Sequence, residues 1–322
     1  MPFSPYFFIF LPSKLAPTLA FPLFLCYNVY TYFLYGAVMD IIEILKILLL
    51  GVVEGITEWL PVSSTGHMLL VDALFSLKAR DEFKEMFFVV IQLGAILAVV
   101  VLFWHKLFPW RKQEEKNGKL ILDKNILNLW GKVLVACVPA GVIGIVCDDF
   151  LEAHLHTPLV IALTLILYGV AFIVVENLNK NKDLPLKTTA DISYKHALII
   201  GAFQVLSLIP GTSRSGATIL GALLVGVARP AGAEFTFYLA IPVMAGASAI
   251  KLLKFFLDGG GFIGAELGYL LIGAAVAFAV SMLAIKFLMN FVKKHDFKVF
   301  GWYRIALGAI VIAALVLPPM FA

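Results

Sequence analysis

Two carboxylates stand on one face of an apolar segment in the first fifth of the chain. Glu54 and Glu58 are four residues apart, which aligns them on a helix, and most of their neighbours are apolar. Carboxylates held together in such surroundings either share a cation, or one of them keeps a proton. A structural pair capped by helix N–H groups or by a lysine is the alternative.

Hydroxyl and imidazole groups follow the carboxylates directly. The run Pro61-Val62-Ser63-Ser64-Thr65-Gly66-His67 contains Pro and Gly and predicts a break in the helix. His67 alone would suggest a satisfied core histidine. Beside two carboxylates and two serines, it becomes a candidate for acid and base catalysis.

A second break carries a guanidinium among hydroxyls. Pro210-Gly211-Thr212-Ser213-Arg214-Ser215-Gly216-Ala217-Thr218 contains one arginine, four hydroxyls and two glycines at the predicted start of a helix. Helix N-termini and arginine forks both favour phosphate or carboxylate, so the run predicts an anion site. A structural ion pair of Arg214 with Glu54 or Glu58 is the alternative, and it too would bring the two breaks together.

The elements that must position these residues are membrane helices. The chain has 322 residues, of which 61% are apolar and 14% charged, which excludes a soluble enzyme. Continuous apolar runs exclude an outer-membrane barrel, and three cysteines without a CxxC pattern indicate neither a disulfide framework nor a zinc site. The net charge of +4 lies mostly in loops, so it bears on orientation and not on nucleic acid.

Hydropathy predicts six spans and an orientation. The spans are 86–104, 132–147, 157–176, 235–257, 265–287 and 304–318. The loops at 105–131, 177–195 and 286–304 are rich in lysine, whereas residues 148–156 carry acidic residues without Lys or Arg. The positive-inside rule assigns the basic loops to the cytoplasm.

The two broken segments, 41–77 and 196–228, are predicted to be re-entrant hairpins, since broken backbone at membrane depth must line protein or a cavity. They resemble each other: Gly51 aligns with Gly201, Glu54 with Gln204, and Pro61 with Pro210. Under the predicted topology the first enters from outside and the second from the cytoplasm. We therefore expect an inverted repeat, with repeat 1 at about 41–147, repeat 2 at about 196–287, and one composite site at the midplane.

Both motifs resemble those of a known family. Gly51-Val-Val-Glu54-Gly-Ile-Thr-Glu58-Trp-Leu-Pro61-Val-Ser63-Ser64-Thr-Gly-His67 and Pro210-Gly-Thr-Ser-Arg214-Ser-Gly-Ala-Thr218 are similar to the signatures of the bacterial undecaprenyl-diphosphatases, the bacitracin-resistance family. The resemblance runs from about Met39 to the C-terminus. It implies an all-α inner-membrane phosphatase of six spanning helices and two re-entrant hairpins, within a single domain at 39–322.

The resemblance also implies an activity and a site. The substrate would be undecaprenyl diphosphate and the products undecaprenyl phosphate, the lipid carrier for cell-wall synthesis, and inorganic phosphate. A divalent cation, Mg²⁺ or Ca²⁺, would be required, with Glu54 and Glu58 as ligands. Carried over to this chain, the catalytic set is Glu58, Ser64, His67 and Arg214, with Glu54 supporting it. The residue types at the two breaks add the phosphate-binding candidates Ser63, Gln204, Thr212, Ser213, Ser215 and Thr218.

Several alternatives stay open at the level of sequence. The attacking group is either Ser64, with His67 as proton acceptor, or an activated water, and the first is favoured. Broken helices in an inverted repeat also suit a transporter or flippase for a polyprenyl phosphate or another anion. The oligomeric state is open, with a homodimer as one candidate. Residues 1–38 are expected to be an atypical extension, from a mis-assigned start or a dispensable helix.

Overall fold

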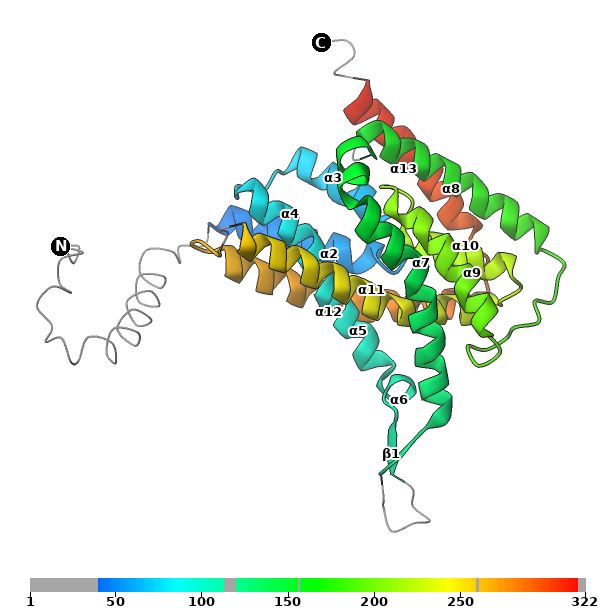
Figure 1. The fold of residues 1–322 in the computed structure, drawn as a ribbon. Coiled ribbons are helices and arrows are strands. Elements are labelled where there is room, and N and C mark those ends of the chain that lie inside the picture. The colour runs from blue at the N-terminus through cyan, green and yellow to red at the C-terminus, as the bar shows by residue number, and fades with distance from the viewer. Residues whose placement is uncertain (1–39, 113–119, 156, 259–260, 318–322) are drawn as a thin grey trace, which may run out of the picture.

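The fold is known from a computed structural model that describes residues 40–112, 120–155, 157–258 and 261–317 (Figure 1). The predicted N-terminal extension, residues 1–38, lies outside the described residues. The helices are α2 (Ile41–Thr57), α3 (Ser64–Leu74), α4 (Asp81–Val90), α5 (Gln92–Leu102), α6 (Trp104–Leu107), α7 (Lys124–Leu155), α8 (Pro158–Leu178), α9 (Tyr194–Val205), α10 (Arg214–Leu224), α11 (Arg229–Leu257), α12 (Glu266–Phe291) and α13 (Lys298–Val311). Short helical turns, η3 (Leu206–Leu208) and η4 (Ile312–Val316), follow α9 and α13.

Six of these helical stretches are long and apolar enough to cross a membrane. They cover Asp81–Leu102, Lys124–Cys147, Pro158–Leu178, Arg229–Leu257, Glu266–Phe291 and Lys298–Val316. The predicted number of spans is therefore confirmed, but the predicted starts at 132, 235 and 304 are too late. The helices themselves start at Lys124, Arg229 and Lys298, because a helix can include a polar first turn that hydropathy alone leaves out.

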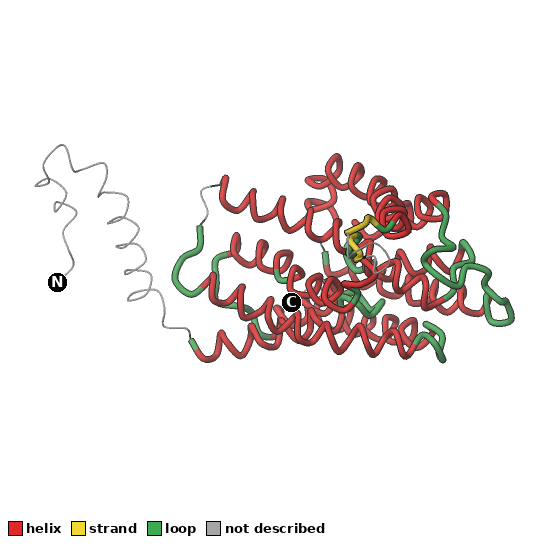
Figure 2. Tube along the Cα trace, turned by 90° about the horizontal axis from the view of Figure 1, so that it is seen from below, coloured by secondary structure: helices red, strands yellow, loops and turns green. Residues whose placement is uncertain are grey.

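The basic segment at 105–131, which was predicted as a loop, contains regular secondary structure. It contains α6 and a two-stranded antiparallel hairpin of β1 (Trp110–Lys112) and β2 (Leu120–Leu122), with Trp110 opposite Leu122. This hairpin extends away from the helices at the bottom of Figure 1. The connecting loops otherwise gather mainly at the two ends of the bundle (Figure 2).

The two broken segments form two helix pairs, α2 with α3 and α9 with α10. Each pair starts with a helix that packs on a distant span: α2 lies along α12, and α9 lies along α7. Glycines permit this close approach. A Cβ on Gly51 would lie 2.9 Å from the carbonyl oxygen of Gly273, and one on Gly201 would lie 2.2 Å from that of Ala136.

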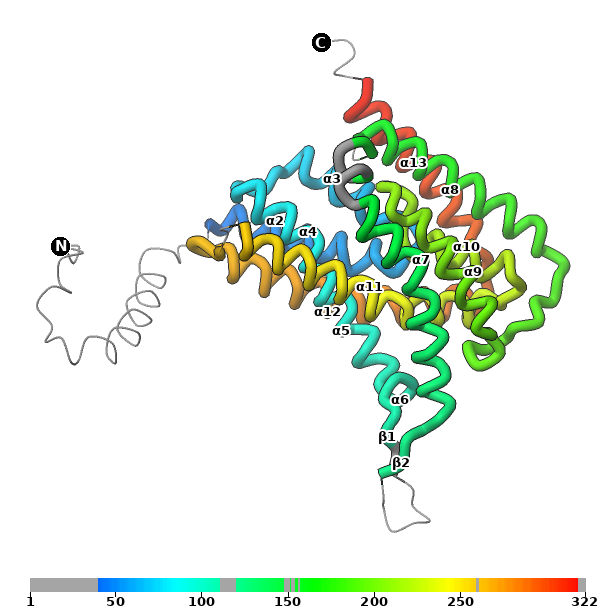
Figure 3. The backbone as a smooth tube through the Cα atoms, viewed as in Figure 1, coloured from blue at the N-terminus to red at the C-terminus, as the bar shows by residue number. Residues whose placement is uncertain are grey.

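The two breaks meet inside the molecule, where the Ser215 hydroxyl at the start of α10 lies 3.1 Å from the carbonyl oxygen of Glu58. The course of the chain from α2 into α3, and from α9 into α10, can be followed in Figure 3. α10 packs against α11 and α8, while α8 and α13 run side by side. Trp59 is fully buried next to Phe237 of α11, with the two rings edge to face at 5.2 Å, so the first break is held inside the main core. The core thereby fixes the residues that follow Trp59.

Candidate active site

The two breaks share one unusual backbone conformation. Ser63 has φ 74° and Ser213 has φ 71°, and in the described part of the chain these are the non-glycine residues with positive φ. Each serine hydroxyl accepts a hydrogen bond from the N–H of a glycine three residues later, Gly66 at 3.3 Å and Gly216 at 3.2 Å. Such a conformation costs about 1–3 kcal/mol per residue and tends to occur at functional sites.

This common backbone corrects the predicted alignment of the two motifs. Ser63 corresponds to Ser213, which is the same offset as that between Gly51 and Gly201. The match of Pro61 to Pro210 is therefore shifted by one residue. The error arose because prolines are conspicuous in a sequence, whereas the residue that repeats structurally is the helix cap.

Glu58 lies at the centre of the candidate site. Its Oε2 accepts a hydrogen bond from the Ser64 hydroxyl at 2.9 Å, and its Oε1 accepts from Nε and Nη2 of Arg214 at 3.3 and 3.0 Å. The Glu58 and Arg214 side chains are 7% and 10% exposed. The prediction that the two breaks come together is confirmed, and the ion pair foreseen as the alternative for Arg214 is present.

The Arg214 guanidinium is held from two further directions. Its Nη1 donates to the carbonyl oxygen of Thr236 on α11 at 3.0 Å, and its Cζ lies 5.8 Å from the centroid of the Trp59 ring. The Ser215 hydroxyl lies 3.1 Å from the carbonyl oxygen of Glu58. Arg214 and Ser64 each begin a helix, so two helix N-termini, with their partial positive charge, converge on the Glu58 carboxylate.

Arg304 joins the two breaks and was missed by the sequence analysis. Its Nη2 donates to the carbonyl oxygens of Gly211 and Thr212, both at 2.9 Å, and its Nη1 donates to that of Pro61 at 3.3 Å. The side chain is fully buried on α13. The predicted last span began at 304, which counted Arg304 as the end of a loop. An arginine inside an apolar span is a signal that could have found it.

His67 does not contact the Ser64 hydroxyl. Its Nδ1 lies 2.7 Å from the carbonyl oxygen of Ser63, and its Nε2 lies 2.7 Å from the hydroxyl of Tyr303, whose ring is stacked on the imidazole. Because a carbonyl only accepts, Nδ1 carries the hydrogen and Nε2 accepts from Tyr303 in the neutral ring. The favoured arrangement, with His67 as the acceptor from Ser64, differs from this geometry, in which Glu58 is the acceptor.

The predicted phosphate-binding hydroxyls mainly stabilise the backbone of the second break. The Thr218 hydroxyl donates to a main-chain carbonyl, with the oxygens of Arg214 and Ser215 at 3.0 and 3.2 Å, and accepts from the Thr236 hydroxyl at 3.0 Å. Ser213 caps α10, and Thr212 is fully buried. These residues position Arg214, and a direct contact with phosphate stays a prediction for them.

Glu54 and Gln204, the matching residues of the two helix pairs, are both buried. The Oε1 of Glu54 and both polar side-chain atoms of Gln204 have no hydrogen-bond partner in the described part of the chain. Within that part there is also no cluster of three or more His, Cys, Asp or Glu side chains that could hold a metal ion. A carboxylate oxygen without a partner suits a hard cation, provided that the other ligands come from Glu58, substrate and water.

Comparisons with known proteins agree with this geometry. The family model for the bacitracin resistance protein BacA matches residues 47–310. The chain belongs to the BacA family. A relative from Enterococcus faecalis named undecaprenyl-diphosphatase is 66% identical over 274 residues, which are 85% of this chain and 98% of the relative. Another of the same name, from Acetivibrio thermocellus, is 55% identical over 84% of this chain and 97% of its own length. The BacA match covers α2 from residue 47 on, α3, the whole second helix pair and Arg304.

Proposed function

We propose that this BacA-family protein is an undecaprenyl-diphosphatase, a hydrolase that converts undecaprenyl diphosphate into undecaprenyl phosphate and inorganic phosphate. The product is the lipid carrier for cell-wall synthesis, and its regeneration confers resistance to bacitracin. The observation that carries the proposal is Glu58, whose carboxylate is bound to the Ser64 hydroxyl and to the Arg214 guanidinium at once. A nucleophile, a base and an anion clamp are thereby joined in one group of residues. The names of the relatives agree with this activity.

The geometry supports nucleophilic attack by Ser64. The Ser64 oxygen attacks the terminal phosphorus of the diphosphate while its proton passes to Glu58 Oε2, and undecaprenyl phosphate leaves. Water then hydrolyses the phosphoserine, releasing inorganic phosphate. Ser64 is the first residue of α3, so the helix N-terminus stabilises the negative charge that develops beside it.

Arg214 binds the phosphate oxygens in this scheme. Its guanidinium is already oriented by the Thr236 carbonyl and the Trp59 ring, so the Arg214 side chain loses less conformational entropy when it binds phosphate. Arg304 keeps both breaks in register through three carbonyls and has no oxygen of a reacting group among its contacts. His67, linked to Tyr303, orients the first turn of α3.

We propose that a divalent cation, Mg²⁺ or Ca²⁺, is bound by Glu54 and Glu58. The partnerless Oε1 of Glu54 supports this assignment. When bound, the ion would neutralise charge on the diphosphate. In the absence of substrate, both oxygens of Glu58 are engaged by Ser64 and Arg214, so the remaining ligands would have to come from the lipid diphosphate and from water.

We further propose that the protein is a multi-pass protein of the bacterial inner membrane, in which the two helix pairs are re-entrant hairpins of an inverted repeat. The two ends of the first pair lie next to each other: Glu43, near the start of α2, accepts a hydrogen bond from the N–H of Lys78, just after α3, at 2.9 Å. Arg80, in the same loop as Lys78, pairs with Glu266 at the start of α12 at 2.8 Å. The two ends of the second pair also lie next to each other: Leu186, before α9, forms a β-bridge with Val227, just after α10. Arg229, at the start of α11, pairs with Glu176 near the end of α8. Each pair therefore starts and finishes at one end of the bundle.

The direction of access follows from the positive-inside rule. The basic loops are assigned to the cytoplasm, which gives the first hairpin an outward opening, and substrate is proposed to enter from the outer leaflet. A single cysteine at Ser76, in a variant lacking the native cysteines, should react with a membrane-impermeant thiol reagent on intact cells. Labelling that requires an exposed cytoplasmic face would reverse the proposed orientation.

Phosphate release by the purified protein tests the activity. Undecaprenyl diphosphate in detergent should yield inorganic phosphate, and EDTA should stop the release. The transporter or flippase alternative predicts that no phosphate is released. The described residues of one chain contain the whole candidate site, so a homodimer, if formed, would not need to complete it.

A further inference from the structure

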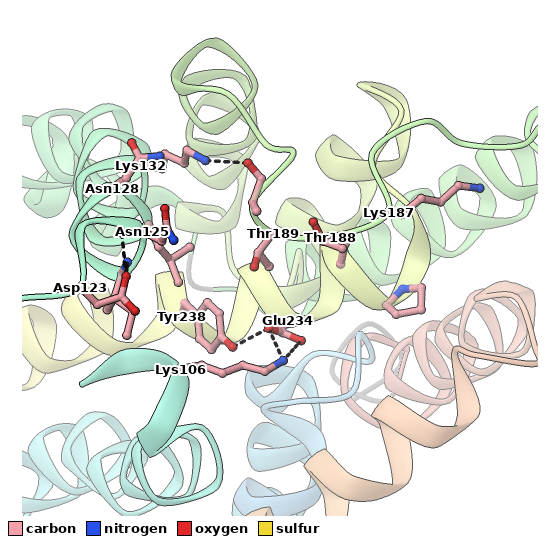
Figure 4. A pocket seen from close by; sticks show the side chains of 15 residues that line it. Lys106, Asp123, Asn125, Asn128, Lys132, Lys187, Thr188, Thr189, Glu234 and Tyr238 are labelled. Atoms are coloured by element: carbon pink, nitrogen blue, oxygen red, sulfur yellow. Dashed lines mark hydrogen bonds and ion pairs between the residues drawn. The ribbon is translucent and has the colours of Figure 1, made fainter. Parts of the chain in front are cut away.

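A cavity of about 600 Å³, with both polar and apolar walls, lies apart from the candidate active site. Its walls come from the first part of α7, the loop that precedes α9 and the start of α11, together with α6 (Figure 4). It shares no residue with the group formed by Glu58, Ser64, His67 and Arg214. The basic loops assigned to the cytoplasm adjoin it, so it belongs to the opposite end of the bundle from the proposed substrate entrance.

The cavity contains a buried ammonium group. Lys132 is 5% exposed, and its Nζ donates to the carbonyl oxygen of Ala190 at 3.0 Å, which satisfies one of its three N–H groups. Lys132 forms no ion pair within the described residues. Asp191 is close enough to interact with it electrostatically, but the Asp191 carboxylate accepts hydrogen bonds from the N–H and the hydroxyl of Thr188. A buried cation with so little compensation is costly unless an anion joins it.

The other charges on the cavity wall are compensated. Lys106 contacts both carboxylate oxygens of Glu234 at 2.9 Å, and the Tyr238 hydroxyl donates to the same carboxylate at 2.6 Å (Figure 4). Lys187 is paired with Asp183. Asp123 also lines the cavity, and its carboxylate accepts from the N–H groups of Asn125 and Ile126 at the start of α7, at 2.9 and 3.4 Å. Lys132 is therefore the cation on the wall that has no ion pair among the described residues.

The remaining lining suits an ester of phosphate better than a simple ion. Figure 4 shows the amides of Asn125 and Asn128 and the hydroxyl of Thr189 around the cavity, and these groups can donate to several oxygens of one anion. Apolar side chains, Ile126, Leu129 and Pro230, complete the wall. One positive charge, several neutral donors and an apolar side match a singly charged phosphate group with an apolar substituent.

We propose that this cavity is a second binding site of the protein, for a phosphate group, with Lys132 as its charged anchor. The group comes either from the headgroup of an anionic lipid in the adjacent leaflet or from free phosphate. The size of the cavity and its apolar wall favour the lipid headgroup. The proposal does not depend on the phosphatase activity, because no catalytic candidate lines the cavity.

Calorimetric titration of the purified full-length protein tests the proposal. All variants carry Arg214→Gln, so that the candidate active site does not contribute phosphate binding. The probes are inorganic phosphate, dihexanoyl phosphatidic acid and, as an uncharged match, dihexanoylglycerol. Lys132→Met removes the charge and keeps a side chain of similar length. Lys182→Met is the matched control, because Lys182 is an exposed lysine outside the cavity.

Phosphatidic acid should bind saturably, the diacylglycerol should not, and Lys132→Met should weaken the affinity at least about tenfold while Lys182→Met leaves it unchanged. Binding of inorganic phosphate as tight as that of phosphatidic acid would support the site with free phosphate as its source. If Lys132→Met fails to fold in a thermal unfolding assay, Asn128→Leu replaces it, with a weakening of about threefold or more. Absence of saturable binding, or equal affinities for the cavity variant and the Lys182 control, would overturn the proposal.

Discussion

The two helix pairs share one backbone conformation but carry different functional side chains at their breaks. Both end their first helix at a break, cap the next helix with a serine at positive φ, and present a helix N-terminus to the same carboxylate. At the position after the cap, however, one pair has the nucleophile candidate Ser64 and the other has Arg214. Likewise, Glu54 in the first corresponds to Gln204 in the second. The shared backbone conformation positions the side chains. The α2–α3 pair, with Ser64, is the reacting half, and the α9–α10 pair, with Arg214, is the anion-binding half.

The strongest test of this division removes the charge that joins the halves. Glu58→Gln loses the proton acceptor for Ser64 and leaves the Arg214 guanidinium buried without its anion. We expect phosphate release to fall by about a thousandfold or more. Glu85→Gln, an exposed carboxylate paired with Lys251, is the matched control and should keep full activity. Activity of the Glu58 variant within tenfold of the parent would refute the assignment of the base.

The anion-binding half can be tested with the charge retained. Arg214→Lys keeps a cation but loses the planar fork that contacts Glu58 and the Thr236 carbonyl. Turnover should fall about 100-fold, which corresponds to about 2.7 kcal/mol of transition-state stabilisation. Arg80→Lys makes the same exchange far from the site and should leave turnover unchanged. A loss of only a few-fold in the Arg214 variant would argue against the clamp.

The connection between the halves depends on Arg304. Arg304→Met removes hydrogen bonds to three carbonyls, each worth about 1.5–3 kcal/mol when the donor is charged. We expect a lower melting temperature, together with a fall in kcat of about 30-fold from misalignment of the breaks. Since Arg304 is assigned no contact with substrate, KM should change little. A large rise in KM with kcat preserved would instead make Arg304 a substrate ligand.

The metal proposal can be tested at Glu54, the carboxylate that has a neutral glutamine, Gln204, as its counterpart in the other half. Glu54→Gln makes the first half match Gln204 of the second. It should retain part of the activity, with a loss of about tenfold, and should need a higher concentration of divalent cation for half-maximal rate. The measurement is phosphate release during titration with Mg²⁺ or Ca²⁺ after treatment with EDTA. An unchanged metal requirement would separate Glu54 from any metal site.

The smallest effects are expected where the halves are most alike. Ser63→Gly and Ser213→Gly each relieve a positive φ, which costs about 1–3 kcal/mol, but each loses a serine cap, worth a few tenths of a kcal/mol relative to glycine, and adds the unfolded-chain entropy of glycine, about 0.5–1 kcal/mol. These effects oppose each other. The two variants should therefore differ from the parent, and from each other, by less than about 1 kcal/mol in unfolding free energy. A strongly unequal response would mean that the two breaks are not equivalent.

Much of this arrangement could be predicted from the sequence because it depends on local signals. Long apolar runs gave the six spans, and Pro, Gly and Ser within apolar surroundings gave both breaks. The meeting of Glu58 with Arg214 followed from the resemblance of the two segments. These features depend on residue type and spacing, which a sequence records directly.

The parts that escaped prediction depend on contacts between distant elements. Arg304 acts on carbonyls of residues far away in the chain, and no spacing rule connects it to Pro61 or Gly211. His67 was favoured as the acceptor of the Ser64 hydroxyl because it is nearer in the motif, whereas in the structure the turn of the break brings Glu58 within hydrogen-bond distance. The cavity around Lys132 requires three separate segments to assemble before it exists.

The packing of α2 on α12, and of α9 on α7, has a consequence for biosynthesis. α2 is among the first helices to leave the ribosome, but the surface that covers Gly51 and Gly55 is made only when residues 266–291 follow. Until then, Glu54 has no completed protein environment to shield it from lipid. We therefore expect the insertion machinery or a chaperone to hold the α2–α3 pair until nearly the whole chain is made. A chain stopped before α12 should accordingly be a target for membrane proteases.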